Sequence, residues 1–343
     1  MLGLIRVVLA LAVLLSHVPG TGFALNPGVV AVICFYTLSG YLMRRSYERF
    51  TQHAAAPARA FLLDRVLKLY PQYLLALAAT ALLLAAWGPS PGFWLLQQEP
   101  TPLKLLLNAL LLPANYIFGP LVITELLPHP LIPPAWSLAT EFHFYLLVPL
   151  LFAFPRLFLA SLLGTLALQF GSLLHESPAL NADTPGYRYI VGVLPVFLMG
   201  WLHAAGHRGA WLLWSAYALL AAAALGGAGI EQPRAREVAL GATLALPLLV
   251  LGRHRRATLQ GARWRAWDER LGNLAYPLFI THCLAFYVVE HCGLPVTAEP
   301  RFIGAAVAVS LAASLLLERV QRHVERLRIG VRGFASMNQA GGS

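Results

Sequence analysis

Two ionisable side chains, Arg6 and His17, lie in the first apolar segment of the chain. Their spacing corresponds in an α-helix to three turns plus about 20° and about 16 Å of rise, so the two side chains share one helix face. Snorkelling to the two membrane interfaces would account for both residues without any chemistry. A neutral imidazole can also accept a proton at physiological pH, which makes His17 a candidate general base.

A carboxyl group lies inside a later apolar run. The segment 136–143 reads WSLATEFH and places Glu141 about two helical turns into that run. A carboxyl group in a membrane must be protonated, paired or used in chemistry. We expect His17 to be its partner, because both residues lie near the same end of their helices. Trp136 and Ser137 are candidates for lining a path to this pair.

Two further polar residues lie within apolar runs and have two interpretations each. His282 lies near the middle of the run 272–291, where a packing hydrogen bond and a catalytic role are equally compatible with the sequence. Ser39 lies in the segment LSGY at 38–41, whose small residues favour close helix packing over a nucleophilic serine. Ser39 and His282 are therefore candidate acceptor-contacting or path-lining residues.

Two cations, Arg65 and Lys68, lie one helical turn apart at the start of another apolar run. Their head groups can converge on one anion, such as a phosphate group. The alternative is that they are topogenic charges that only orient the helix in the membrane.

Membrane helices are the elements that must position these residues. Of the 343 residues 58% are hydrophobic and only 12% are charged, with a mean hydropathy of +0.65, so no large soluble domain is expected. Ten apolar runs long enough to be spans occur at 2–19, 28–43, 61–87, 135–154, 157–175, 188–204, 210–228, 237–252, 272–291 and 302–318. We predict an all-α polytopic bundle of about ten transmembrane helices.

The predicted bundle is one domain over residues 1–329, followed by a short disordered tail at 330–343. The connection 88–134 contains an apolar stretch at 103–112 that is too short to span and is expected to be re-entrant or interfacial. Cleavage of the first segment as a signal peptide is the alternative at 22–24, but no basic region precedes the apolar stretch.

The distribution of basic residues predicts the topology. With a cytoplasmic N-terminus, 20 of the 25 Lys and Arg residues fall on the cytoplasmic side, and the other side keeps Lys104, Arg188, Arg234, Arg236 and Arg301. We therefore expect a multi-pass protein of the inner (cytoplasmic) membrane with both termini in the cytoplasm.

Several classes of protein are disfavoured by the sequence. The three cysteines form no CxxC pair and no HExxH is present, so we expect no metal site. GxSxG, Walker and GxGxxG motifs are also absent. The net charge of +10 is explained by topology, because the arginine clusters separate apolar segments, and we expect no nucleic-acid partner.

Five short motifs occur in an order found in a known family. Arg6 and His17 match an Arg, ten residues, His motif, and 38–41 is similar to a Leu-Ser-Gly-Phe segment. The segment 61–71, FLLDRVLKLYP, is similar to an RxxR segment, and 136–141 matches a Trp-Ser-Leu, two residues, Glu motif. The segment 271–282 is similar to a late segment ending in Tyr-Leu-x-His.

Together the five motifs resemble the integral-membrane acyltransferase-3 family over most of the chain. The chain departs from the family at Lys68, which replaces the second Arg of RxxR and loses its bidentate geometry, and at Pro277, which replaces a Ser and is expected to bend the ninth predicted helix. Since the chain ends soon after its last predicted helix, we expect no appended hydrolase-like domain of the kind that some relatives carry.

The resemblance implies an O-acyltransferase. It would move an acyl group, most simply acetyl, from cytoplasmic acetyl-CoA to a hydroxyl of an extracytoplasmic carbohydrate or glycolipid, with acetyl-CoA as a substrate and no bound cofactor. In this reading Arg6, Arg65 and Lys68 bind the donor, and His17 with Glu141 performs the proton transfer. The alternative is a transporter or flippase of lipid-linked glycans in which buried His and Glu residues relay protons.

Overall fold

The protein is an all-α helical bundle, as predicted. A computed structural model describes residues 1–117, 121–227, 229–230, 232–258 and 261–337, with the side chains of 255–258, 262 and 332–337 left undescribed. No strand occurs in these ranges. The α-helices are α1 (Leu2–Ser16), α2 (Pro27–His53), α3 (Pro57–Trp87), α4 (Pro102–Leu110), α5 (Ala135–Ala153), α6 (Pro155–Leu174), α7 (Ile190–Ala204), α8 (Gly209–Leu225), α9 (Pro233–Thr258), α10 (Ala262–His291) and α11 (Pro300–Met337).

Each of the ten predicted spans coincides with one helix, and α4 is the additional short one. Seven helices, α2, α3, α5, α6, α9, α10 and α11, are long and apolar enough to cross a membrane. The helices α1, α7 and α8 are shorter, at 15 to 17 residues. The described part of the chain is therefore an integral membrane bundle.

Local sequence determines where many helices begin. Six of the helices above start at a proline, whose fixed φ suits the first helical position and whose missing N–H would have no partner there. The Asn26 side chain accepts hydrogen bonds from the backbone N–H groups of Gly28 and Val29 and so caps α2.

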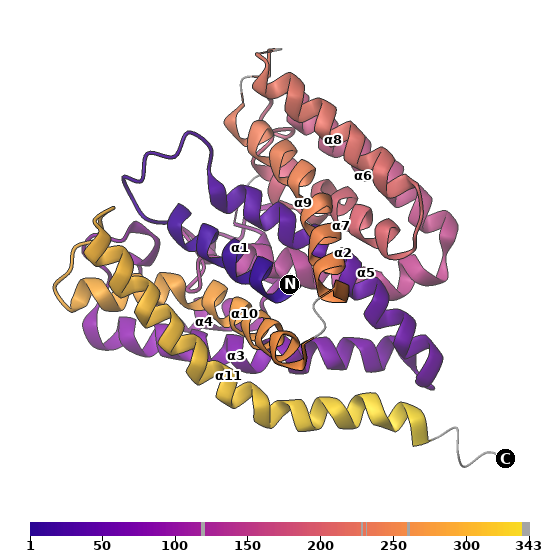
Figure 1. The fold of residues 1–343 in the computed structure, drawn as a ribbon. Coiled ribbons are helices and arrows are strands. Elements are labelled where there is room, and N and C mark those ends of the chain that lie inside the picture. Colours follow the sequence, from indigo (N-terminus) through magenta and orange to yellow (C-terminus); the bar gives the residue numbers. More distant parts are fainter. Residues whose placement is uncertain (118–120, 228, 231, 259–260, 338–343) are drawn as a thin grey trace.

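The helices are arranged around a central group of three. In Figure 1, α1, α2 and α10 lie in the middle of the bundle, α3 and α11 cover one side, and α6 and α8 lie at the opposite side. Helix α1 packs against both α2 and α10, and α2 packs against α7 and α9. This packing brings the first and tenth helices together and so joins segments at opposite ends of the sequence.

Helices α2 and α7 cross in close contact through two glycines. A Cβ atom on Gly40 would lie 1.8 Å from the carbonyl oxygen of Phe197, and a Cβ atom on Gly200 would lie 1.9 Å from that of Thr37. The backbones can therefore approach this closely only because both residues lack a side chain. The predicted packing role of the LSGY segment is confirmed at Gly40.

Arg6, Lys68 and Arg328 lie together at one end of the bundle. There the N-terminal ammonium group lies 3.1 Å from Asp268 at the start of α10, and the last turns of α11 pack beside the start of α3. We call this the basic end. A disordered tail is expected at 330–343, but α11 continues through residues 330–337. The rest of that segment, 338–343, lies outside the described ranges.

The expected bend at Pro277 does not interrupt the helix. Helix α10 is continuous from Ala262 to His291, and the Thr281 hydroxyl donates a 2.8 Å hydrogen bond to the Pro277 carbonyl oxygen. Pro277 lacks the N–H that would bond the Asn273 carbonyl oxygen, so the Thr281 hydrogen bond does not replace the lost one, and membrane helices tolerate such a loss. His282 consequently has a defined direction, toward α1.

Candidate active site

Three neighbouring cavities run through the interior of the bundle. The central cavity, about 300 Å³, is lined by residues of α1, α2, α3, α5 and α10. It shares Val32, Ser137 and Phe279 with the His17 cavity, about 330 Å³, and shares Arg6, Lys68 and Tyr276 with the α11 cavity, about 320 Å³. The shared wall residues place the three cavities in a row, with the central one in the middle.

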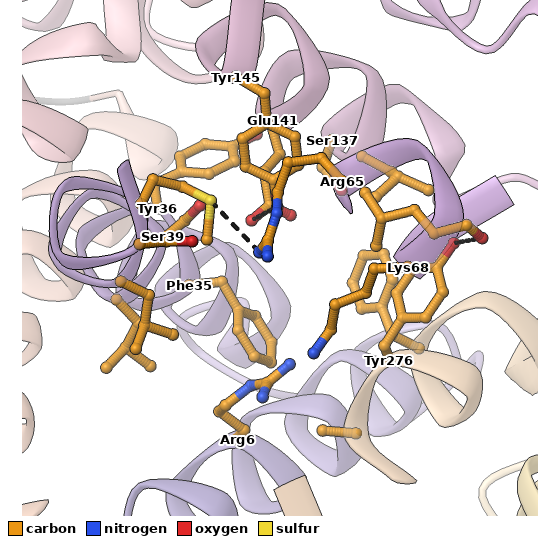
Figure 2. Close-up of a pocket in the computed structure, with 18 of the residues that line it drawn as sticks. Arg6, Phe35, Tyr36, Ser39, Arg65, Lys68, Ser137, Glu141, Tyr145 and Tyr276 are labelled. Atoms are coloured by element: carbon orange, nitrogen blue, oxygen red, sulfur yellow. Dashed lines mark hydrogen bonds between the residues drawn. The ribbon is translucent and has the colours of Figure 1, made fainter. Parts of the chain in front are cut away.

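The central cavity collects the cations that the sequence singled out. Arg6 from α1 and Arg65 and Lys68 from α3 point into it from opposite sides, as Figure 2 shows. No hydrogen bond or ion pair is recorded for the Arg6 and Lys68 head groups among the described residues. Cations in a membrane interior are costly without partners, and this cavity holds more cationic than acidic side chains, so it is suited to an anionic ligand.

Arg65 is anchored on one side and has donors left on the other. One guanidinium nitrogen, Nη2, donates to the neighbouring Asp64 carboxylate, and Nη1 lies 3.6 Å from the Met43 sulfur. Its buried Nε has no hydrogen-bond partner in the described part of the chain. A buried N–H group without a partner costs about 1 to 3 kcal/mol, which a ligand oxygen would recover.

His17 lies at the end of α1 and contacts His282 of α10. The His17 Nδ1 lies 2.9 Å from the Val13 carbonyl oxygen and 3.3 Å from His282 Nε2, and the two rings are 4.9 Å apart. The His282 Nδ1 lies 2.7 Å from the Phe279 carbonyl oxygen.

These contacts assign the protons of the two imidazoles. A carbonyl oxygen can only accept, so Nδ1 carries the hydrogen in both rings. The single hydrogen on His17 Nδ1 is then shared between the Val13 carbonyl oxygen and His282 Nε2, and the lone pair on His17 Nε2 is left available as a base. The Val13 carbonyl oxygen fixes the His17 tautomer, and His282 helps to orient the ring for general-base chemistry.

The expected pairing of His17 with Glu141 is not formed. The Glu141 carboxylate accepts a 2.6 Å hydrogen bond from the Tyr145 hydroxyl and lines the central cavity, where it is close enough to Arg6 for an electrostatic interaction. His17 lines the neighbouring cavity instead. Position along each helix placed both residues at one depth, but it does not specify which cavity a side chain enters.

The other predicted residues line the same row of cavities. Ser39 lines the central cavity, Trp136 lines the His17 cavity, and Ser137 lies in the wall that the two share. The Ser137 hydroxyl donates to the Pro134 carbonyl oxygen at 3.0 Å. The fully buried His282 lies behind His17. The nine predicted site residues therefore belong to one connected region.

Charged residues from the connecting segments surround the His17 cavity. The Arg188 guanidinium lies 4.6 Å from the centre of the Trp136 ring, and both Arg188 and Arg234 pair with Asp183, at 3.0 Å and 2.7 Å. Burial acts to raise the pKa of the Asp183 carboxyl, but the two guanidinium groups outweigh it and hold that pKa below its usual value. These arginines form ion pairs with acidic side chains, whereas Arg6 and Lys68 form no ion pair within the described ranges.

The α11 cavity adds residues that sequence reasoning missed. Asp64 of α3 is fully buried, and Arg328 of α11 donates to both of its oxygens at 3.2 and 3.3 Å. Tyr145 could have been found, because it lies one turn after Glu141. Arg328 could not, because it lies 264 positions from Asp64 and no local pattern joins them. No group of three or more His, Cys, Asp or Glu in the described ranges is arranged to hold a metal ion.

Comparison with known proteins gives two matches. The sequence profile of the acyltransferase-3 family, described as an acyltransferase domain, matches residues 2–319. An uncharacterized protein of Aquifex aeolicus (strain VF5) is 24% identical over 215 residues, which is 57% of this chain and 89% of that protein. No solved structure matches.

Proposed function

This chain belongs to the acyltransferase-3 family, and we propose that it moves an acetyl group from cytoplasmic acetyl-CoA to a hydroxyl of an extracytoplasmic carbohydrate or glycolipid. In this proposal the basic end faces the cytoplasm of a cell with an inner membrane, as the positive-inside rule predicts. The acceptor then approaches His17 from the opposite end.

The row of three cavities is the observation that carries this proposal. It leads from the cations at the basic end, past Glu141, to the imidazole of His17. A donor held by its phosphates at the basic end can extend its acyl arm along this row without exposing polar groups to lipid. A transporter of glycans would not need a group of cations that converges on a phosphate-sized anion on one side only.

The donor side of the proposal depends on charge. Phosphates of acetyl-CoA would contact Arg6, Arg65 and Lys68, each contact being a charge-assisted hydrogen bond. Glu141 would lie beside this donor site, where its carboxylate, held by Tyr145, keeps Arg6 directed into the cavity. We therefore assign Glu141 to positioning of the donor and His17 to proton transfer.

The transfer step follows from the assigned tautomers. His17 Nε2 accepts the proton of the acceptor hydroxyl while the hydroxyl oxygen forms a bond with the acetyl carbonyl carbon. The carbon–sulfur bond then breaks, and the proton passes from His17 to the departing thiolate of CoA. The Val13 carbonyl oxygen and the His282 ring share the His17 Nδ1–H throughout and keep the base oriented.

The experiment measures acetyl-CoA binding and turnover by the purified protein in detergent. Turnover is measured by the release of the free CoA thiol. We expect the wild type to bind and turn over acetyl-CoA, His17→Ala to bind it without turnover, and Glu141→Gln to bind it more weakly. His282→Ala should lower turnover with little change in binding. Absence of both binding and turnover in the wild type would favour the transporter alternative, and acetyl-labelled protein that is lost in His17→Ala would show a covalent acyl-imidazole route.

A further inference from the structure

A buried carboxylate lies between two arginines at the boundary of the central and α11 cavities. Asp64 contacts Arg65 on the same helix and Arg328 on α11, and all three side chains are at least nine-tenths buried. Arg65 lines the central cavity and Arg328 lines the α11 cavity. How far Asp64 offsets the positive charge that Arg65 offers to a ligand therefore depends on Arg328.

The contacts divide the charge of Asp64 unequally. Arg328 reaches both carboxylate oxygens through Nε and Nη2, while Arg65 uses Nη2 alone and keeps a buried Nε without a partner in the described part of the chain. A two-point arginine contact is the stronger arrangement for a carboxylate. If Arg328 were removed, Asp64 would be left to neutralise Arg65 alone.

Arg328 is itself held from the opposite side. Its Nη1 donates to Glu325, one turn earlier on α11, and the Glu325 side chain is 37% exposed. A partly exposed carboxylate is screened by solvent, whereas Asp64 is not. Glu325 therefore fixes the direction of Arg328 and competes only weakly with Asp64 for its charge.

We infer that Arg328 is a positioning residue of the donor site, which holds the Asp64 carboxylate so that the Arg65 guanidinium stays available to a donor phosphate. The inference rests on the proposed function, because it takes acetyl-CoA as the donor. Arg328 lies beyond residue 319, where the family match ends, so this contribution of α11 is not part of what the match describes.

The test compares CoA, which carries phosphates, with pantetheine, which carries none, as ligands of the full chain in detergent. Arg328→Gln should weaken CoA binding about tenfold or more, the effect of losing one charge-assisted contact, and should leave pantetheine binding unchanged. The double variant Asp64→Asn with Arg328→Gln removes one charge of each sign and should restore CoA binding to near the wild-type value. Asp64→Asn alone should bind CoA at least as tightly as the wild type.

The matched control is Arg326→Gln, which removes the same charge from the same helix but from an exposed arginine that lines none of the three cavities. It should change CoA binding little. Wild-type affinity for CoA in Arg328→Gln, or a double variant as weak as Arg328→Gln, would overturn the inference. If Arg328→Gln does not reach the membrane, weakened CoA binding by Asp64→Asn overturns it equally. A wild-type protein that does not bind CoA would instead refute the proposed function.

Discussion

The crossing of α2 and α7 allows one perturbation to be worked out from distances. A methyl group added in Gly40→Ala would lie 1.8 Å from the Phe197 carbonyl oxygen, and ordinary contact begins at 3.4 Å, so the two helices must separate locally by about 1.6 Å. Overpacking of this kind costs about 1 to 3 kcal/mol of unfolding free energy. Ser39, the preceding residue, lines the central cavity, so acetyl-CoA binding should weaken as well.

The assay is thermal unfolding of the purified protein in detergent, together with acetyl-CoA binding. Gly164→Ala in α6 is the matched control, because nothing lies within 4 Å of its added methyl group and alanine is the better helix former. Gly40→Ala and Gly200→Ala act on the same crossing, so the double variant should lose less stability than the sum of the single variants. A Gly40→Ala protein as stable as Gly164→Ala would refute the reasoning from close contact.

Two further predictions follow from the charges. A reporter fused after Ser343 should report the cytoplasm, and one inserted within 176–180 should report the opposite side, because loops rich in basic residues are retained in the cytoplasm. A C-terminus outside the cytoplasm would reverse the proposed donor and acceptor ends. Since the folded-state pKa of Asp183 is lowered, its ion pairs stabilise the fold above the usual pKa of an aspartate and are lost as pH falls through the folded value. Between about pH 5 and about pH 3, the temperature of unfolding should therefore fall less in Asp183→Asn than in the wild type. An equal fall in both proteins would contradict the ion-pair argument.

The helices could be predicted from hydropathy because each span must satisfy its own backbone in lipid. The polar extensions of α2, α10 and α11 could not, since they lie past the apolar runs and are held by contacts such as that between Arg328 and Asp64. Helix α11 accordingly continues past residue 329, where the predicted domain ends.

Sequence reasoning identified residues that line the cavities, but it did not identify which of them contact one another. The cost of charge in a membrane singled out Arg6, His17 and Glu141 correctly as interior residues. Which of them meet depends on helix rotation and tilt, and these are set by packing between distant segments. The packing places His282, and not Glu141, in contact with His17. Lys68 lines the central cavity, which a purely topogenic role does not explain.

The wall between the central and His17 cavities has a consequence for the energetics of the cell. Moving one elementary charge across a membrane potential of about 100 mV corresponds to about 2.3 kcal/mol, so an open file of water through this protein would dissipate the stored gradient. Two of the three residues in that wall, Val32 and Phe279, are apolar and give a proton no hydrogen-bonding partner. An apolar constriction between the two cavities would admit an acyl chain more readily than a continuous file of water.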